Sequence, residues 1–218
     1  MASSARLIPW ASASFLPIPA DASSIVVREY VGDAAAEEPA TLHIETLIPA
    51  APQALSDDEL AEQFTSMAWT LAKLATLHRT IKPELLDTPN VLLTAEAADL
   101  GAADTTPDNL YMIGTFRLGP DQALVLDIDP PDTRYWNVTL ENVWHECLEP
   151  QRRHTSVTNN AVSPGADGRV RIAISAKDFG LGHWLDTGGR ERGFVILRWL
   201  DNPQPPAVTA TVVDAGRS

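Results

Sequence analysis

The stretch that decides the fold is "LYMIGTFRLGPDQALVLDI", Leu110 to Ile128. Two apolar runs of strand length flank a Gly-Pro-Asp sequence, which is typical of a turn. Four similar runs follow along the chain: "RYWNVTLENVWH" (134–145), "RVRIAIS" (169–175), "GFVILRWL" (193–200) and "AVTATVV" (207–213). The runs do not alternate with helical patterns, so the sequence predicts antiparallel sheets and argues against a parallel one.

The N-terminal half adds two strands and one helix. The runs "IVVREYV" (25–31) and "TLHIETL" (41–47) predict a hairpin with a long turn. Residues 56–81 predict a helix, because Ser56 and Glu59 form a capping box and apolar residues recur at helical spacing. Residues 83–107 carry a weaker pattern, with a short helix expected near 92–100.

Eight strands and one helix predict a mainly β (α+β) fold. We expect an antiparallel β-sandwich of jelly-roll type, with the long helix packed on it through residues such as Phe64 and Met67. The expected organisation is an extended arm over residues 1–24, a hairpin plus helical segment over 25–107 and the β-sandwich domain over 108–214.

Composition narrows the classes of partner. The 218 residues include 16 basic and 29 acidic ones, a formal net charge of −13, which disfavours binding to nucleic acid or to an anionic membrane surface. Cys147 is the single cysteine, so an intramolecular disulfide is excluded and a cytoplasmic location is expected. The five histidines are scattered, and the pattern predicts neither a metal site nor a cofactor.

Arginine residues interrupt two apolar strand patterns. Even positions share one face of the strand at 134–145, which we take as the inner face: Arg134, Trp136, Val138, Leu140, Asn142 and Trp144. Arg198 lies likewise among apolar residues in "GFVILRWL". A guanidinium group among tryptophans requires a carboxylate, a carbonyl or a bound anion. An internal ion pair with Asp186 or Glu141 and an anionic ligand both satisfy this requirement.

A glycine-punctuated stretch, "DFGLGHWLDTGGRERGF" (178–194), separates two predicted strands. A loop of this length is typical of a lid or a binding loop. Within it, His183 and Asp186 are candidates for acid–base catalysis, Trp184 for an apolar wall and Thr187 for a polar contact. Cys147 with His145 is a weaker alternative as a nucleophile and its base, because a lone cysteine is more often a small buried apolar residue.

These segments together resemble the domain of unknown function 1214 family, a bacterial domain often found with the related domain 1254. The resemblance covers roughly residues 108–214. The residues that carry it are Asp108, Asn109, Tyr111, Arg134, Tyr135, Trp136, Trp184, Leu185, Asp186, Thr187, Gly189, Arg198 and Trp199. Relatives commonly have Asn before the Trp-Leu pair, where this chain has His183. The resemblance implies a β-sandwich or jelly-roll domain and brings no established reaction.

The sequence therefore predicts a protein that binds a small organic, anionic ligand near the 178–193 loop. The expected ligand-binding residues are Tyr111, Arg134, Trp136, Trp144, Trp184, Thr187 and Arg198. One alternative is a metal-free hydrolase or isomerase that uses His183 and Asp186. Another is a structural or assembly module in which the same residues only form a core. Homo-oligomerisation is also predicted, since Trp69 lies off the apolar stripe of the helix.

Overall fold

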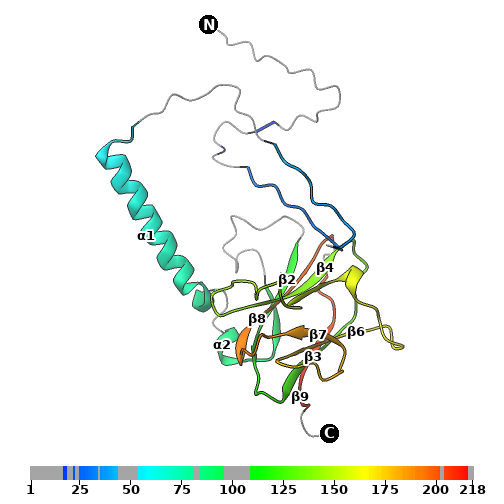
Figure 1. Cartoon of the computed structure of the whole chain (residues 1–218). Coiled ribbons are helices and arrows are strands. Elements are labelled where there is room, and N and C mark those ends of the chain that lie inside the picture. Colours follow the sequence, from blue (N-terminus) through cyan, green and yellow to red (C-terminus); the bar gives the residue numbers. More distant parts are fainter. Residues whose placement is uncertain are drawn as a thin grey trace, which may run out of the picture. The chain divides into compact units, whose positions relative to one another are not determined.

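The computed structural model describes residues 17–18, 22, 25–33, 35–43, 54–80, 84–95, 109–201 and 204–215. The chain divides into two compact units, residues 1–30 and 31–218. Every described helix and strand belongs to the second unit (Figure 1). Among the described residues, no helix is long and apolar enough to cross a membrane.

Two β-sheets form the body of the second unit. Sheet A has five strands in the order β1 (Leu92–Ala95), β2 (Leu110–Arg117), β8 (Arg192–Trp199), β4 (Trp136–Glu141) and β5 (Ser156–Thr158). Sheet B has four in the order β7 (His183–Asp186), β6 (Val170–Ser175), β3 (Gln122–Ile128) and β9 (Val208–Asp214). The mainly β character predicted from the sequence is confirmed, and all six strand patterns beyond residue 109 correspond to strands.

Strand order brings distant segments of the chain together. β8 pairs with both β2 and β4, so that it lies inside sheet A, and β9 pairs with β3. All of these pairs are antiparallel. The exception is β7, which pairs with β6 in parallel, and the prediction of purely antiparallel sheets is wrong at this position. The connection 176–182 carries the chain back to the start of β6, helped by Gly180, whose φ of 70° favours glycine.

The two sheets share one hydrophobic core. In β4, Trp136, Val138 and Leu140 are at most 5% exposed and belong to this core. Alternate residues of the neighbouring strands join them: Met112, Phe116, Val157, Val195, Leu197 and Trp199 of sheet A, and Leu124, Leu126, Ile128, Val170, Ile172, Ile174 and Leu185 of sheet B. Side chains alternate along a strand, so the intervening residues of each strand face away from this core.

The predicted helix is present as α1 (Asp57–Thr80). Its capping box is formed, since the Ser56 amide donates to Glu59 Oε2 at 2.8 Å and the Glu59 amide donates to Ser56 Oγ at 3.3 Å. The expected packing of its apolar side chains is not found, because Phe64 and Met67 are 67% and 59% exposed and Trp69 and Leu71 are more exposed still than Met67. Helical periodicity predicts a helix, but it does not identify what the apolar stripe contacts.

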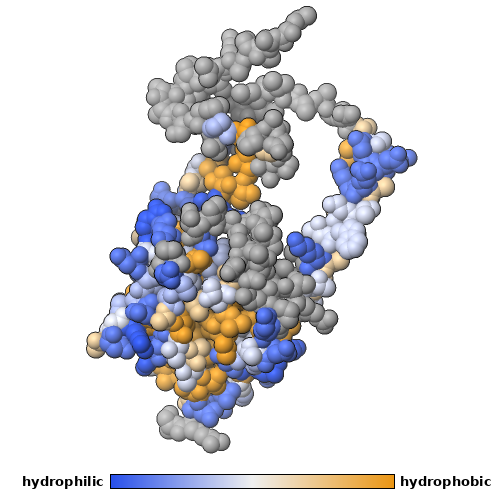
Figure 2. All heavy atoms as spheres, turned by 180° about the vertical axis from the view of Figure 1, so that it is seen from behind, coloured by the Kyte–Doolittle hydropathy of each residue, from blue (hydrophilic) through white to orange (hydrophobic). Residues whose placement is uncertain are grey.

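Exposed apolar residues also occur near the start of the described chain. Figure 2 shows apolar patches between hydrophilic residues on one face of the molecule. Residues 25–31 and 41–43, expected in a hairpin, are not in strands, and residues 44–47 lie outside the described residues. The turn itself exists, since the Glu37 amide donates to the Asp33 carbonyl at 2.8 Å. Strand propensity alone does not produce a strand without a paired neighbour.

Residues 84–95 also differ from the prediction. A short helix, α2 (Glu84–Asp87), precedes β1, and β1 occupies residues 92–95 where a helix was expected. β1 pairs with β2 from Leu92 opposite Gly114 to Ala95 opposite Tyr111, and this pairing overrides the local helical tendency of leucine and alanine. A 3-10 turn, η1 (Asn159–Ala161), follows β5.

Candidate functional site

The face of sheet A that points away from the shared core, here called the outer face, carries the candidate site. Tyr111, Arg198 and Asn137 lie in one row across β2, β8 and β4, because each pairs with the next in register. Part of this face is apolar, and α2 contributes Leu85 to the cluster there: Leu85, Ala95, Ile113, Phe194 and Ile196. The side chains that β4 places on this face are polar. The outer face is therefore half apolar and half polar, unlike the core side.

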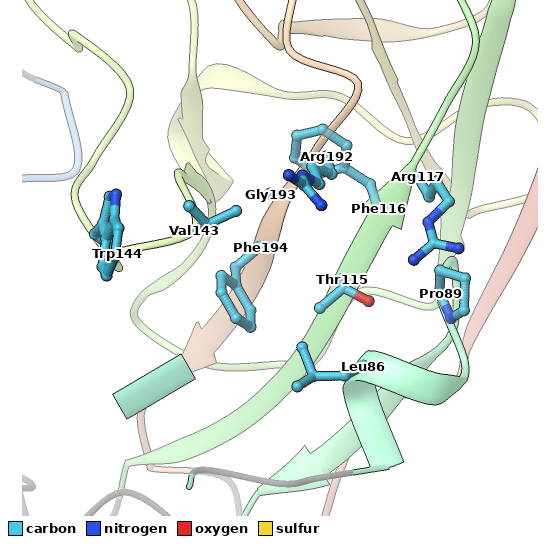
Figure 3. A pocket seen from close by; sticks show the side chains of 10 residues that line it. All are labelled: Leu86, Pro89, Thr115, Phe116, Arg117, Val143, Trp144, Arg192, Gly193 and Phe194. Carbon is cyan, nitrogen blue, oxygen red and sulfur yellow. The ribbon is translucent and has the colours of Figure 1, made fainter. Parts of the chain in front are cut away.

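A pocket of about 270 Å³ opens on the outer face. Phe194 and Thr115, which oppose each other on β8 and β2, lie at its centre. Figure 3 shows Val143 and Trp144 on one side of Phe194, and Leu86 and Pro89 beyond Thr115. The remaining lining residues are Phe116, Arg117, Arg192 and Gly193. The α2 segment and the turn after β4 thus supply the walls, and the sheet supplies the floor.

Two arginines line the same pocket. Arg117 ends β2 and Arg192 begins β8, and the two are directly opposite each other in the antiparallel register. Asn90 bonds the backbone of Arg117 through its side-chain oxygen and nitrogen, at 2.9 and 3.1 Å, which fixes the end of the strand. Within the described part of the chain, neither guanidinium group has an ion-pair or hydrogen-bond partner. Like charges directly opposite each other destabilise a strand pair.

The turn after β4 is held by Asn142. Its side-chain oxygen accepts from the amides of Trp144 at 2.8 Å and Glu146 at 3.1 Å, while its side-chain nitrogen donates to Glu146 Oε2 at 2.6 Å. His145, inside this turn, has a left-handed φ of 61°. The turn folds the His145 ring back over the neighbouring strand β8, where it stacks on Phe194 with ring centroids 3.9 Å apart.

Glu141, at the end of β4, links this turn to β8. The carboxylate is buried, with Oε2 2.9 Å from His145 Nδ1 and Oε1 3.5 Å from Arg198 Nη2. In the neutral imidazole this geometry places the proton on Nδ1, because an ionised carboxylate only accepts hydrogen bonds. Arg198 also lies 5.7 Å from the Tyr111 ring centroid, within cation–π range.

Cys147 follows the same turn and forms a backbone bridge with Glu141. Burial raises the pKa of the Cys147 thiol, the negative charge of Glu141 raises it further, and Arg198 opposes this effect. A cysteine acts as a nucleophile in its deprotonated form, the thiolate. A raised pKa therefore disfavours Cys147 as a nucleophile at neutral pH.

Two of the predicted ligand-binding residues, Tyr111 and Arg198, lie together on the outer face. The carboxylate beside Arg198 is Glu141, one of the two partners that the sequence made plausible. Both residues are partly buried, and Asn109 Nδ2 reaches the Tyr111 hydroxyl at 3.4 Å. They lie on the opposite face of sheet A from Trp136, which points into the core and which the sequence prediction placed with them.

The other residues of the predicted Trp and Arg face are dispersed. Arg134 precedes β4, is exposed and pairs with Asp201 at 2.6 Å, not with Asp186 or Glu141. Trp136 is buried in the core between the sheets. Trp144 is exposed and lines the outer-face pocket. Alternation of faces holds only within β4, so Arg134 and Trp144, which lie beyond its two ends, do not share the face of Trp136 as the sequence predicted.

The predicted pair His183 and Asp186 is not assembled. Both belong to β7, a strand within the stretch expected to be a loop. His183 Nε2 lies 3.2 and 3.3 Å from the backbone nitrogen and oxygen of Ser163, whereas Asp186 accepts from Arg153 at 2.8 Å and from the Gly188 amide at 2.7 Å. Residues three apart in a strand point to opposite faces, so the two side chains diverge.

Two further residues of the 178–194 stretch, Trp184 and Thr187, lie in β7 or directly after it. Trp184 Nε1 donates to the Ser175 carbonyl at 3.2 Å, across the parallel β6–β7 pair. Thr187 is 1% exposed, next to the strand. Neither residue lines the outer-face pocket.

The sequence reasoning missed Arg117, Arg192 and Phe194 as site residues. A signal existed, since "TFR" and "RGF" end and begin two apolar strands with an arginine. Their meeting depends on the pairing of β2 with β8, which is set by residues far apart in the sequence. His145 and Glu141 lie four residues apart, yet the turn that joins them is irregular and has no periodic signature.

No family model and no curated protein sequence matches the chain. The chain is similar to an uncharacterised protein from Burkholderia cenocepacia whose crystal structure is known, with a TM-score of 0.71 and 29% identity. That alignment covers 77% of this chain and 47% of the Burkholderia chain. A protein from Vibrio parahaemolyticus also matches, at a TM-score of 0.39 and 16% identity over 73% of this chain and 47% of that one. This chain thus spans about half the length of both.

Proposed function

We propose that the outer-face pocket binds a small organic anion. Arg117 and Arg192 hold the anionic group, and Phe194 with Trp144 contacts the apolar part of the ligand. The observation that carries the proposal is the pair of opposed arginines, without acidic partners among the described residues, on the lining of an apolar pocket.

Charge explains why an anion suits this position. Two guanidinium groups on opposite strands repel each other, and a carboxylate or phosphate group between them removes the repulsion. Guanidinium groups bind such groups bidentately, which also fixes the orientation of the ligand. The aromatic and aliphatic walls favour a ligand with an apolar body, as in most small-molecule sites.

The proposal keeps the ligand class predicted from the sequence and changes its location. Tyr111 and Arg198 remain on the same face of sheet A as the pocket. Trp144 remains a wall residue, whereas the 178–193 stretch is replaced by the turn after β4 and by α2.

A thermal-shift screen with small organic acids, followed by calorimetric titration, tests this function. A ligand at about a hundred times its dissociation constant stabilises the folded protein by roughly 2.7 kcal/mol. The double variant Arg117→Gln/Arg192→Gln is expected to lose the shift. Arg152→Gln, an exposed arginine outside the pocket, is the matched control and retains it. Equal shifts in the double variant and the wild type would contradict the proposal.

We infer that the two sheets stack as a β-sandwich of jelly-roll type. The single core that draws on both sheets supports this, as does the insertion of β8 between β2 and β4. The parallel β6–β7 pair is a local departure from this topology.

We further propose that the chain is a relative of the domain of unknown function 1214 family and that it works in the cytoplasm. The motifs from Tyr111 to Trp199 support the first statement, and the single cysteine supports the second.

Homo-oligomerisation also stays a proposal, supported by the exposed apolar residues of α1: Leu60, Phe64, Met67, Trp69 and Leu71. Analytical ultracentrifugation at micromolar concentration tests it, and a monomer would contradict it.

A further inference from the structure

Helix α1 carries a narrow row of exposed apolar side chains, here called the seam: Leu60, Phe64, Met67 and Leu71. They follow one another at intervals of four, three and four residues, and the sequence continues this spacing at Leu74. At 3.6 residues per turn the four fall within an arc of roughly 60°. Phe64, Met67 and Leu71 are 67%, 59% and 65% exposed. A row this narrow is typical of a coiled coil, whereas a helix that packs on the core of its own domain has a wider apolar stripe.

The positions on both sides of the seam suit a second helix. On one side, Ala61, Ala68 and Ala75 recur every seven residues. Side chains this small allow two helix axes to approach closely. On the other side lie Gln63 and Thr70, which are uncharged, and the Thr70 hydroxyl donates to the backbone of its own helix at 2.9 Å. The flanks of the seam thus hold no charge that would repel a second copy of the same helix.

The charges of α1 are divided between its two halves. Its acidic residues, Asp57, Asp58, Glu59 and Glu62, all lie in the first two turns, and the basic residue whose side chain the structure describes, Lys73, lies in the C-terminal half. A parallel pair of copies would bring both sets of carboxylates together at one end, where like charges repel. An antiparallel pair keeps them at opposite ends of a helix about 36 Å long, each beside the basic half of the partner. Charge therefore favours the antiparallel arrangement.

We propose that α1 forms an antiparallel two-helix pair with α1 of a second copy of the chain, through the seam. This inference rests on the proposed homo-oligomerisation and specifies its surface, its stoichiometry and its orientation. The same seam on both copies covers itself, so the assembly closes as a dimer. Pairing removes from water the apolar side chains that α1 leaves exposed in the single chain. Trp69 takes no part, since it lies about 180° around the helix from Leu60.

Analytical ultracentrifugation of the full chain over a range of micromolar concentrations tests the stoichiometry and the surface. The wild type is expected to sediment as a dimer in equilibrium with monomer. Phe64→Ala/Leu71→Ala shortens two seam side chains in each copy and is expected to raise the dimer dissociation constant about a hundredfold or more. Trp69→Ala is the matched control, because this aromatic residue is 73% exposed, like Phe64, but lies outside the seam. The control is expected to leave the dissociation constant unchanged.

The seam variant is expected to fold. Alanine has the highest helix propensity, and neither Phe64 nor Leu71 belongs to the core between the two sheets. The thermal unfolding transition of each variant checks that the sheets are intact.

Crosslinking tests the orientation and does not depend on the seam variant. Cys147→Ser removes the native thiol, which is exposed. In that background a single cysteine is introduced either as Ala68→Cys, near the middle of α1, or as Asp57→Cys, at its first residue. A short bismaleimide is expected to join two copies through position 68 and not through position 57, because an antiparallel pair places the two first residues at opposite ends.

Several outcomes overturn this inference and leave the proposed homo-oligomerisation intact. Crosslinking through both positions indicates a parallel pair, and crosslinking through neither places the contact elsewhere. An oligomer that persists unchanged in Phe64→Ala/Leu71→Ala, or that Trp69→Ala weakens to the same extent, does not use the seam. A monomer at every concentration overturns the homo-oligomerisation and this inference together.

Discussion

The two faces of sheet A are built from the same strands and differ in kind. On the core side, β4 and β8 present Val138, Leu140 and Leu197, none more than 2% exposed. On the outer side, the same two strands present Asn137, Glu141 and Arg198 beside Phe194 and Ile196. One face is a closed apolar layer, and the other holds buried polar groups and a pocket.

The difference between the two faces separates the residues that stabilise the fold from those of the proposed binding site. An apolar face that is fully covered gains free energy from burial and has no group left to contact a ligand. Buried polar groups contribute less to stability, because their hydrogen bonds replace equivalent ones with water. The proposed ligand binding would give these groups a role besides folding.

The largest expected effect comes from adjacent residues of β4 on opposite faces. Leu140→Ala is expected to lower the free energy of unfolding by about 2–5 kcal/mol through lost burial and the cavity left behind. Thr139→Ala removes one hydrogen bond, accepted from Asn137 Nδ2 at 3.1 Å, and is expected to cost about 1 kcal/mol. Urea denaturation measures both, and equal losses would remove the distinction between the two faces.

A second change tests the buried carboxylate on the outer face. Glu141→Gln keeps the size of the side chain and removes the charge that faces His145 and Arg198. A loss of about 1–3 kcal/mol is expected, because hydrogen bonds to charged groups contribute more than neutral ones. Glu62→Gln, an exposed carboxylate on α1, serves as the control. A smaller loss for Glu141→Gln than for Glu62→Gln would show that the buried cluster contributes nothing.

The arginine pair is expected to affect stability least of the three outer-face changes. Arg117→Gln/Arg192→Gln removes two like charges in direct opposition, so the free energy of unfolding should stay within about 0.5 kcal/mol of the wild type or rise slightly. Thermal denaturation without ligand measures this. A large loss would mean that the two arginines hold the fold and would weaken their assignment to ligand binding.

The smallest effect concerns the exposed N-terminus of α1. Hydrogen bonds from the Ser56 amide and hydroxyl lower the pKa of Glu59. A carboxyl whose pKa is lower in the folded state stabilises that state above its unfolded pKa and loses this contribution as the pH falls through the folded value. NMR titration of Glu59 should therefore show a lowered pKa that returns toward the ordinary value in Ser56→Ala. The same pKa in both proteins would contradict the role of the cap.

Much of the fold follows from local pattern. Helix α1 and its cap were predictable because Ser56, Glu59 and the apolar spacing lie within one segment, and six strands were predictable from short apolar runs. Strand pairing was not, and β1, β5 and β7 exist through pairing with neighbours more than through their own composition.

The site was less predictable than the fold for the same reason. Arg198 was recognised because it interrupts an apolar strand, and Trp144 because it is aromatic. Arg117 and Arg192 are brought together only by the register of β2 with β8, which pairs residues 75 apart in the sequence. His145 depends on a turn with a left-handed residue, for which the sequence contains no glycine as a marker.

The positions of β8 and β9 bear on how the protein is made. β8 separates β2 from β4 inside sheet A, and β9 pairs along the whole of β3 in sheet B. During synthesis β1 and β2, β4 and β5, and β3, β6 and β7 can pair early, but β2 and β4 are not joined and one edge of β3 stays unpaired until residues 192–214 follow. Pairing between such distant segments is slow, and unpaired strand edges favour aggregation in the meantime. The nascent chain therefore passes most of its translation with sheet A in two parts and β3 at an open edge of sheet B, and a chain cut short before β8 would lack the strand that joins β2 to β4.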